Sequence, residues 1–141
     1  MIVINKDLTL ITHTRDDNGE VRIIPVTCYI RDHTTTPDAH PENSNGAFYP
    51  GFYQPKPFPA GNWIVVRVEP NDNPYTAPFF IATNAHQTVT CFDGSVVEDY
   101  GYGIHFSTSP TTWGCLRVET DGDLRWLASL VKPGEKIAVG G

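Results

Sequence analysis

The chain has 141 residues and a formal net charge of −6, and its length is typical of one domain. Hydrophobic residues make up 40% and charged residues 18%, which supports a folded core and excludes an intrinsically disordered chain. No cluster of lysine and arginine is present, which argues against nucleic-acid binding, and no apolar run is long enough for a membrane span. The 12 glycines and 12 prolines stand in short groups, as in a β-rich fold with many turns.

The first 30 residues predict a β-hairpin, with strands at residues 8–13 and 21–30 and turn residues at 16–19. Pro25 lies inside the second strand and favours an edge position or a bulge, because proline cannot donate to a sheet. Residues 31–60 contain six of the prolines and show no periodicity. We expect this segment to be a long irregular loop over the functional site.

The rest of the chain predicts further strands and one helix. Apolar residues at spacings of three and four indicate a helix over residues 120–131, in which Thr120 and Asp123 have the spacing of an N-terminal cap. Glu98 and Asp99 are expected in a solvated turn. We expect a mainly β fold that forms a single domain over residues 1–141, with one short C-terminal helix and with strands at residues 62–69, 78–82, 87–92, 102–106, 114–118 and 136–139.

The three cysteines lie far apart and include no Cys-x-x-Cys pair, so we expect free thiols and no zinc site. Cys28 and Cys91 fall within strand runs and are expected to be small core residues. His33 and His40 have no third ligand at a useful spacing, so neither a metal nor another cofactor is expected. The thiol that remains as a candidate for chemistry is that of Cys115.

His105 and Cys115 lie ten residues apart and have the residue types of a nucleophilic pair. A cysteine attacks a carbonyl as its thiolate, and a nearby histidine can take the thiol proton. Gly114, directly before the cysteine, allows a substrate backbone to approach closely. Arg117 lies two residues beyond Cys115 and on the same face of a strand, where it could bind a substrate carboxylate.

Several motifs follow one another in order in the second half of the chain. They are Gly103-Ile104-His105, Trp113-Gly114-Cys115-Leu116-Arg117-Val118, Asp123-Leu124 and Gly134-Glu135-Lys136-Ile137, preceded by the segment from Pro57 to Val65. This order resembles the catalytic domain of the L,D-transpeptidase (YkuD-type) family, and the resemblance extends from about Lys56 to Val139.

The resemblance implies a β-sandwich that acts on peptidoglycan stem peptides. It implies that Cys115 is the nucleophile and His105 the base, with the imidazole oriented by the backbone carbonyl of Phe106. Backbone N–H groups at Gly114 and Cys115 would form the oxyanion hole, and Arg117 matches the arginine that follows the family's nucleophile. An acyl-enzyme on the cysteine would then be resolved by an amine, as in a transpeptidase, or by water, as in an L,D-carboxypeptidase.

Two departures from the family pattern bear on the reaction and on its setting. Trp113 stands where the family usually has histidine, and it either contacts substrate or packs inside. The interval between His105 and Cys115 is short, which weakens transpeptidation with a bulky acceptor more than it weakens hydrolysis. With the proline-rich entry segment, this interval resembles that of type VI secretion effectors.

The N-terminus has neither the basic region nor the apolar stretch of a signal peptide. We therefore expect a monomer made in the cytoplasm that reaches the cell wall after delivery or lysis, as a bacterial toxin effector or a phage enzyme. A delivery apparatus or an immunity protein would be its partner. The alternative from another class is a β-rich phage or virion structural protein with an incidental thiol. A papain-like peptidase is excluded, because there the cysteine precedes the histidine and lies on a helix.

Overall fold

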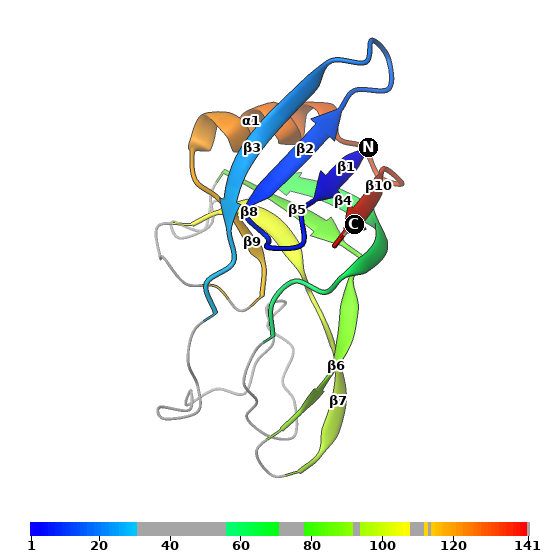
Figure 1. Cartoon of the computed structure of the whole chain (residues 1–141), viewed down its shortest axis with the longest axis vertical. Coiled ribbons are helices and arrows are strands. Elements are labelled where there is room, and N and C mark those ends of the chain that lie inside the picture. Colours follow the sequence, from blue (N-terminus) through cyan, green and yellow to red (C-terminus); the bar gives the residue numbers. More distant parts are fainter. Residues whose placement is uncertain (31–55, 71–77, 92–93, 108–111, 113, 141) are drawn as a thin grey trace.

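The computed structural model describes residues 1–30, 56–70, 78–91, 94–107, 112 and 114–140. Most of the predicted loop over residues 31–60 therefore lies outside the described residues, as does Trp113. The elements in chain order are β1 (Ile2–Ile4), β2 (Leu10–Thr14), β3 (Val21–Thr27), β4 (Gly61–Pro70), β5 (Phe79–Thr83), β6 (His86–Thr90), β7 (Val96–Tyr100), β8 (Gly103–Phe106), β9 (Leu116–Val118), α1 (Asp121–Leu130) and β10 (Lys136–Val139) (Figure 1).

Eight strands close into a barrel in the order β1-β10-β4-β5-β8-β9-β3-β2. Two long strands each belong to both halves of this barrel. β3 pairs with β2 through residues 21–25 and then with β9 through residues 26–27. β4 pairs with β10 through residues 61–64 and then with β5, with a register shift between Val65 and Arg67. The expected mainly β fold with one helix near the C-terminus is thus confirmed, and the two halves of the barrel are joined at β3 and β4.

The strands β6 and β7 pair separately as an antiparallel two-stranded sheet, which we call the arm. Figure 1 shows the arm extending away from the barrel. Sequence reasoning did not predict β7, and the expectation that Glu98 and Asp99 form a solvated turn is wrong. Both residues lie in β7, and Asp99 is only 1% exposed. Its carboxylate can be buried because it accepts a hydrogen bond from the Tyr102 hydroxyl at 2.8 Å.

The other strand and helix predictions are confirmed to within a few residues. Pro25 is opposite Leu10 and directly precedes Val26 and Thr27, which pair with β9. Because β3 lies between β2 and β9, the expected edge position is wrong, and the proline lies where the strand changes from one partner to the other. The helix α1 begins after Thr120, whose hydroxyl accepts a hydrogen bond from the Asp123 N–H at 3.2 Å, as expected of a cap. Among the described residues, no helix has the length and apolarity needed to cross a membrane.

The core fills the barrel and extends beneath α1, which contacts β5, β8 and β9. Leu124 and Leu127 of α1 are fully buried, as their helical spacing predicts. The helix therefore packs on the core side of β5, β8 and β9, the strands that carry the candidate site. The main strand residues of this core are Ile2, Ile4, Ile11, Ile24, Val26, Val65, Ile81, Ile104, Leu116, Val118 and Ile137.

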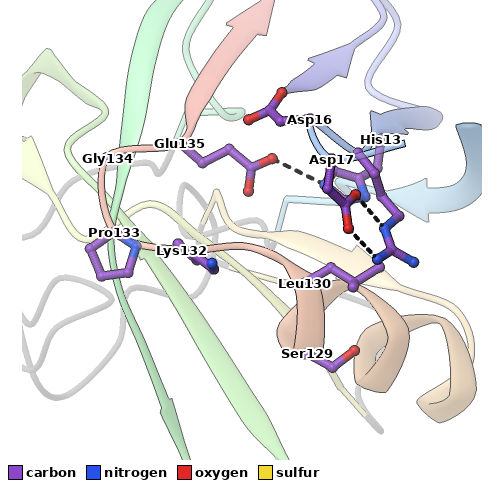
Figure 2. A pocket seen from close by; sticks show the side chains of 10 residues that line it. His13, Asp16, Asp17, Ser129, Leu130, Lys132, Pro133, Gly134 and Glu135 are labelled. Carbon is purple, nitrogen blue, oxygen red and sulfur yellow. Dashed lines mark hydrogen bonds and ion pairs between the residues drawn. The ribbon is translucent and has the colours of Figure 1, made fainter. Parts of the chain in front are cut away.

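A polar contact joins β2 to the turn that precedes β10. His13 is 1% exposed, and its Nε2 lies 3.1 Å from Oε1 of Glu135, which also lies 2.8 Å from the Met1 amino group. Both side chains line a pocket of about 540 Å³ between the β2–β3 turn, the end of α1 and residues 132–135 (Figure 2). The pocket is lined by acidic and basic side chains together, and we regard the His13–Glu135 contact as structural.

We predict that Glu135→Ala lowers the free energy of unfolding by about 1–3 kcal/mol, because buried His13 then loses its carboxylate partner. The matched control is Glu119→Ala, which deletes the same side chain at an exposed position. Urea unfolding of both variants at neutral pH measures the difference. Equal stability of the two variants would show that the buried contact contributes nothing.

Candidate active site

The candidate site is built on the parallel pairing of β8 with β9, in which His105 is opposite Arg117 and Ile104 is opposite Leu116. Ile104 and Leu116 are fully buried in the core. Because side chains alternate along a strand, His105 and Arg117 lie on the other face of the sheet. Cys115 immediately precedes β9 and lies two residues before Arg117, so the same alternation places it on the face of His105.

Phe80 of β5 extends this face on the other side of β8. It is opposite His105 in the antiparallel β5–β8 pairing. The two rings stack with a centroid separation of 5.8 Å and an interplanar angle of 21°. A Cβ atom on Gly103 would collide with the Phe80 ring, so this glycine gives the ring its place beside the imidazole. Sequence reasoning missed Phe80, because nothing in a run of strand residues marks which of them neighbours a histidine from another strand.

His105 is 6% exposed, and its Nδ1 lies 2.8 Å from the carbonyl oxygen of Phe106. A carbonyl can only accept, so Nδ1 carries the proton and Nε2 presents its lone pair. Burial lowers the pKa of His105, the hydrogen bond to Phe106 opposes this shift, and the positive charge of Arg117 adds to the lowering. The imidazole is therefore neutral at neutral pH and able to accept a proton.

Cys115 is 3% exposed, and its thiol donates to the carbonyl oxygen of Gly101 at 3.5 Å. The preceding turn is held by Thr112, which sequence reasoning also missed. The Thr112 hydroxyl donates to the Cys115 carbonyl oxygen at 2.8 Å and accepts from the Gly114 N–H at 3.3 Å. The Gly114 N–H, which was predicted to serve the oxyanion hole, thus has a hydrogen-bond acceptor within the turn.

Gly114 occupies a position that only glycine fits. Its φ is +115°, and a Cβ atom there would lie 2.5 Å from Cε1 of Tyr102 and 2.6 Å from the carbonyl oxygen of Lys56. The carbonyl oxygen of Gly114 accepts from the Cys28 thiol at 3.4 Å. Burial raises the pKa of Cys28, which keeps this second thiol protonated. The residue before the candidate nucleophile is therefore enclosed on several sides.

Arg117 is half-buried beside His105. Its Nε donates to the carbonyl oxygen of Ser107 at 2.8 Å, and its Cζ lies 6.0 Å from the centre of the Phe106 ring. The bond through Nε fixes the orientation of the planar guanidinium. Within the described part of the chain, no group of three or more His, Cys, Asp or Glu side chains could hold a metal ion.

The fold resembles that of solved L,D-transpeptidases. One is the L,D-transpeptidase (Yku) from Stackebrandtia nassauensis, with a TM-score of 0.54 and 12% identity over 99% of this chain and 54% of that one. Another is Mycobacterium tuberculosis L,D-transpeptidase 1, with a TM-score of 0.49 and 16% identity over 99% of this chain and 60% of that one. The chain thus spans little more than half the length of these structures. No protein-family model and no curated protein sequence matches it.

We predict that Gly114→Ala lowers the free energy of unfolding by at least about 2 kcal/mol, because the new methyl group meets both backbone strain and a filled space. Gly122→Ala is the matched control, since a Cβ on this helical glycine meets nothing within 4 Å. That variant should be neutral or more stable by up to about 1 kcal/mol. Thermal and urea unfolding measure both, and a Gly114→Ala protein as stable as the control would contradict the close packing.

The lowered pKa of His105 predicts an acid-sensitive contribution to stability. Its pKa in the folded chain lies below the ordinary value of 6.5, so the unfolded chain binds the proton more readily than the folded chain does. The free energy of unfolding should therefore fall as the pH drops below 6.5. Urea unfolding at several pH values should show a shallower fall in His105→Gln than in the wild type. Identical pH dependence of the two proteins would rule out this contribution.

Proposed function

We propose that this chain is a cysteine enzyme that acts on peptidoglycan stem peptides at an L,D bond through an acyl-enzyme on Cys115. The observation that carries the proposal is the parallel β8–β9 pairing, in which the oriented imidazole of His105 is opposite Arg117 and Cys115 directly precedes β9. The likeness of the fold to the L,D-transpeptidase from Stackebrandtia nassauensis supports the choice of reaction.

In the first step, Cys115 Sγ would pass its proton to His105 Nε2 and attack the carbonyl carbon of the third stem residue. A carbon–sulfur bond forms, and the carbonyl oxygen becomes an oxyanion. The Gly114 N–H could stabilise this oxyanion by exchanging its bond to Thr112, which at 3.3 Å is longer than the usual 2.9 Å or so. The hydroxyl of Thr112 would keep its bond to the Cys115 carbonyl during this exchange.

In the second step, the bond between the carbonyl carbon and the nitrogen of the terminal D-amino acid breaks. The leaving nitrogen takes the proton from His105 Nε2, and a thioester remains on Cys115. Water or an amine acceptor then attacks the thioester, again with His105 as the base. Arg117 is suited to bind a carboxylate of the stem peptide, because its guanidinium lies beside His105 with Nε already held by a backbone carbonyl.

The test is incubation of purified tetrapeptide and pentapeptide muropeptides with the wild type and with Cys115→Ala and His105→Ala. Mass spectrometry should show loss of a terminal D-amino acid with the wild type, or its exchange when a D-amino acid is added. Cys115→Ala should be inactive, and His105→Ala should be slower by about 10²–10⁴-fold. Cys91→Ala is the matched control, because it deletes another buried thiol on the arm side of the molecule.

Muropeptides left intact by the wild type would refute the proposed reaction and favour the structural-protein alternative. Full activity in Cys115→Ala would refute the mechanism while leaving the substrate class in place. A single product mass also distinguishes the acceptors, because hydrolysis leaves a tripeptide stem and transfer leaves a stem extended by the added amine.

A further inference from the structure

The arm is tied to the candidate nucleophile by a buried network that the proposed mechanism does not use. Tyr102, which links the arm to β8, is fully buried, and its hydroxyl donates to Oδ2 of Asp99 at 2.8 Å. Nε2 of Gln87 donates to the same hydroxyl oxygen at 2.9 Å and to the carbonyl oxygen of Pro57 at 2.7 Å. Asp99 and Gln87 are opposite each other in the β6–β7 pairing. The hydroxyl is therefore held between both strands of the arm.

The backbone end of Tyr102 is fixed as well. Its carbonyl oxygen accepts from the Thr83 hydroxyl at 2.6 Å and from the Thr83 N–H at 3.3 Å. The ring packs edge-on against Phe58, with centroids 5.8 Å apart. Because its hydroxyl, its ring and its peptide are all held, the Tyr102 side chain has little freedom to move. Its place relative to the arm therefore also determines the place of the residues that pack against it.

What Tyr102 touches is the turn that carries the nucleophile. A Cβ on Gly114 would lie 2.5 Å from its ring, so the ring forms the surface on which the residue before Cys115 rests. The residue before Tyr102 is Gly101, whose carbonyl oxygen accepts from the Cys115 thiol at 3.5 Å. The placement of Tyr102 therefore sets the position of both Gly114, which precedes Cys115 in the chain, and the Gly101 carbonyl oxygen, which accepts from the thiol.

We propose that Asp99 and Tyr102 are positioning residues for Cys115, holding its thiol within reach of His105 through the Gly114 turn and the Gly101 carbonyl. This proposal rests on the proposed role of Cys115 as a nucleophile. A buried carboxylate is costly unless it is hydrogen-bonded, and removal of the Tyr102 hydroxyl takes one of the hydrogen bonds of Asp99 away. The network is thus a rigid unit whose loss displaces the turn, and displacement of a reacting group by even 1 Å can slow a reaction by about 10²-fold.

The experiment compares Tyr102→Phe with Tyr100→Phe, which removes the same group from a half-exposed tyrosine two residues earlier, at the end of β7. The substrate-independent readout is the rate of alkylation of Cys115 by iodoacetamide as a function of pH, resolved from Cys28 and Cys91 by peptide mass spectrometry. The His105→Ala profile serves as the reference for a thiol that has lost its base. Tyr102→Phe should move the Cys115 profile at least half-way from the wild type toward this reference, and Tyr100→Phe should leave it unchanged.

A second readout is turnover of the muropeptide, for which Tyr102→Phe should lower kcat about tenfold or more at an unchanged KM. Asp99→Asn, whose amide oxygen can still accept the tyrosine hydroxyl, should retain most of the wild-type rate. If Tyr102→Phe does not fold, Gln87→Met tests the same hydroxyl from the more accessible side and should give a smaller shift of the same kind.

A folded Tyr102→Phe protein with the wild-type alkylation profile and kcat would overturn the proposal and leave the network a purely structural one. A profile that moves away from the His105→Ala reference would overturn it too. If the wild type does not turn over muropeptides at all, the proposed substrate is wrong, while the alkylation profiles still decide whether Asp99 and Tyr102 position the thiol.

Discussion

The candidate site depends on one strand pairing, the parallel alignment of β8 with β9. If the same two segments formed a simple antiparallel hairpin with its turn centred on residue 110, His105 would be opposite Cys115. The parallel pairing instead puts His105 opposite Arg117 and moves the cysteine two positions back, beside the start of β8. A guanidinium thus becomes the direct neighbour of the imidazole and helps to lower its pKa. The direction of one strand therefore decides which residues meet, whereas burial makes the largest contribution to the lowered pKa of His105 and the Arg117 charge a smaller one.

Burial sets the character of the site once this pairing is made. His105, Cys115 and Thr112 are all less than 7% exposed, and each donates to a backbone carbonyl oxygen. A site with so little water disfavours charged groups, and this burial is the largest cause of the lowered pKa of His105. The same low dielectric strengthens any interaction with charge that develops on a bound substrate. The carbonyl oxygens of Phe106 and Gly101 help to orient the imidazole and the thiol.

Local sequence patterns were enough to predict the elements whose structure is determined locally. The helix from Asp121 to Leu130, its cap at Thr120 and the β2–β3 hairpin follow from periodicity and turn residues, and the motif order led to His105 and Cys115. Thr112 was missed although its hydroxyl bonds to groups only two and three residues along the chain, a local pattern typical of threonine in turns. Phe80 could not be predicted, because its role arises from strands that meet only in the folded chain. The error at Asp99 has the same origin: a carboxylate predicts exposure unless the tyrosine that satisfies it is known to be adjacent.

The buried carboxylate of Asp99 helps to attach the arm to the rest of the molecule. A two-stranded sheet has little stability of its own in water, so β6 and β7 need contacts with the rest of the molecule. Gln87 and Asp99 provide such contacts by holding the Tyr102 hydroxyl from both strands, and Gln87 also reaches the carbonyl oxygen of Pro57. An apolar anchor would attach the arm without fixing an orientation, whereas hydrogen bonds with defined directions fix it. Gly114, the residue before Cys115, packs against the ring of Tyr102. The same hydrogen bonds that attach the arm therefore also help to position the thiol.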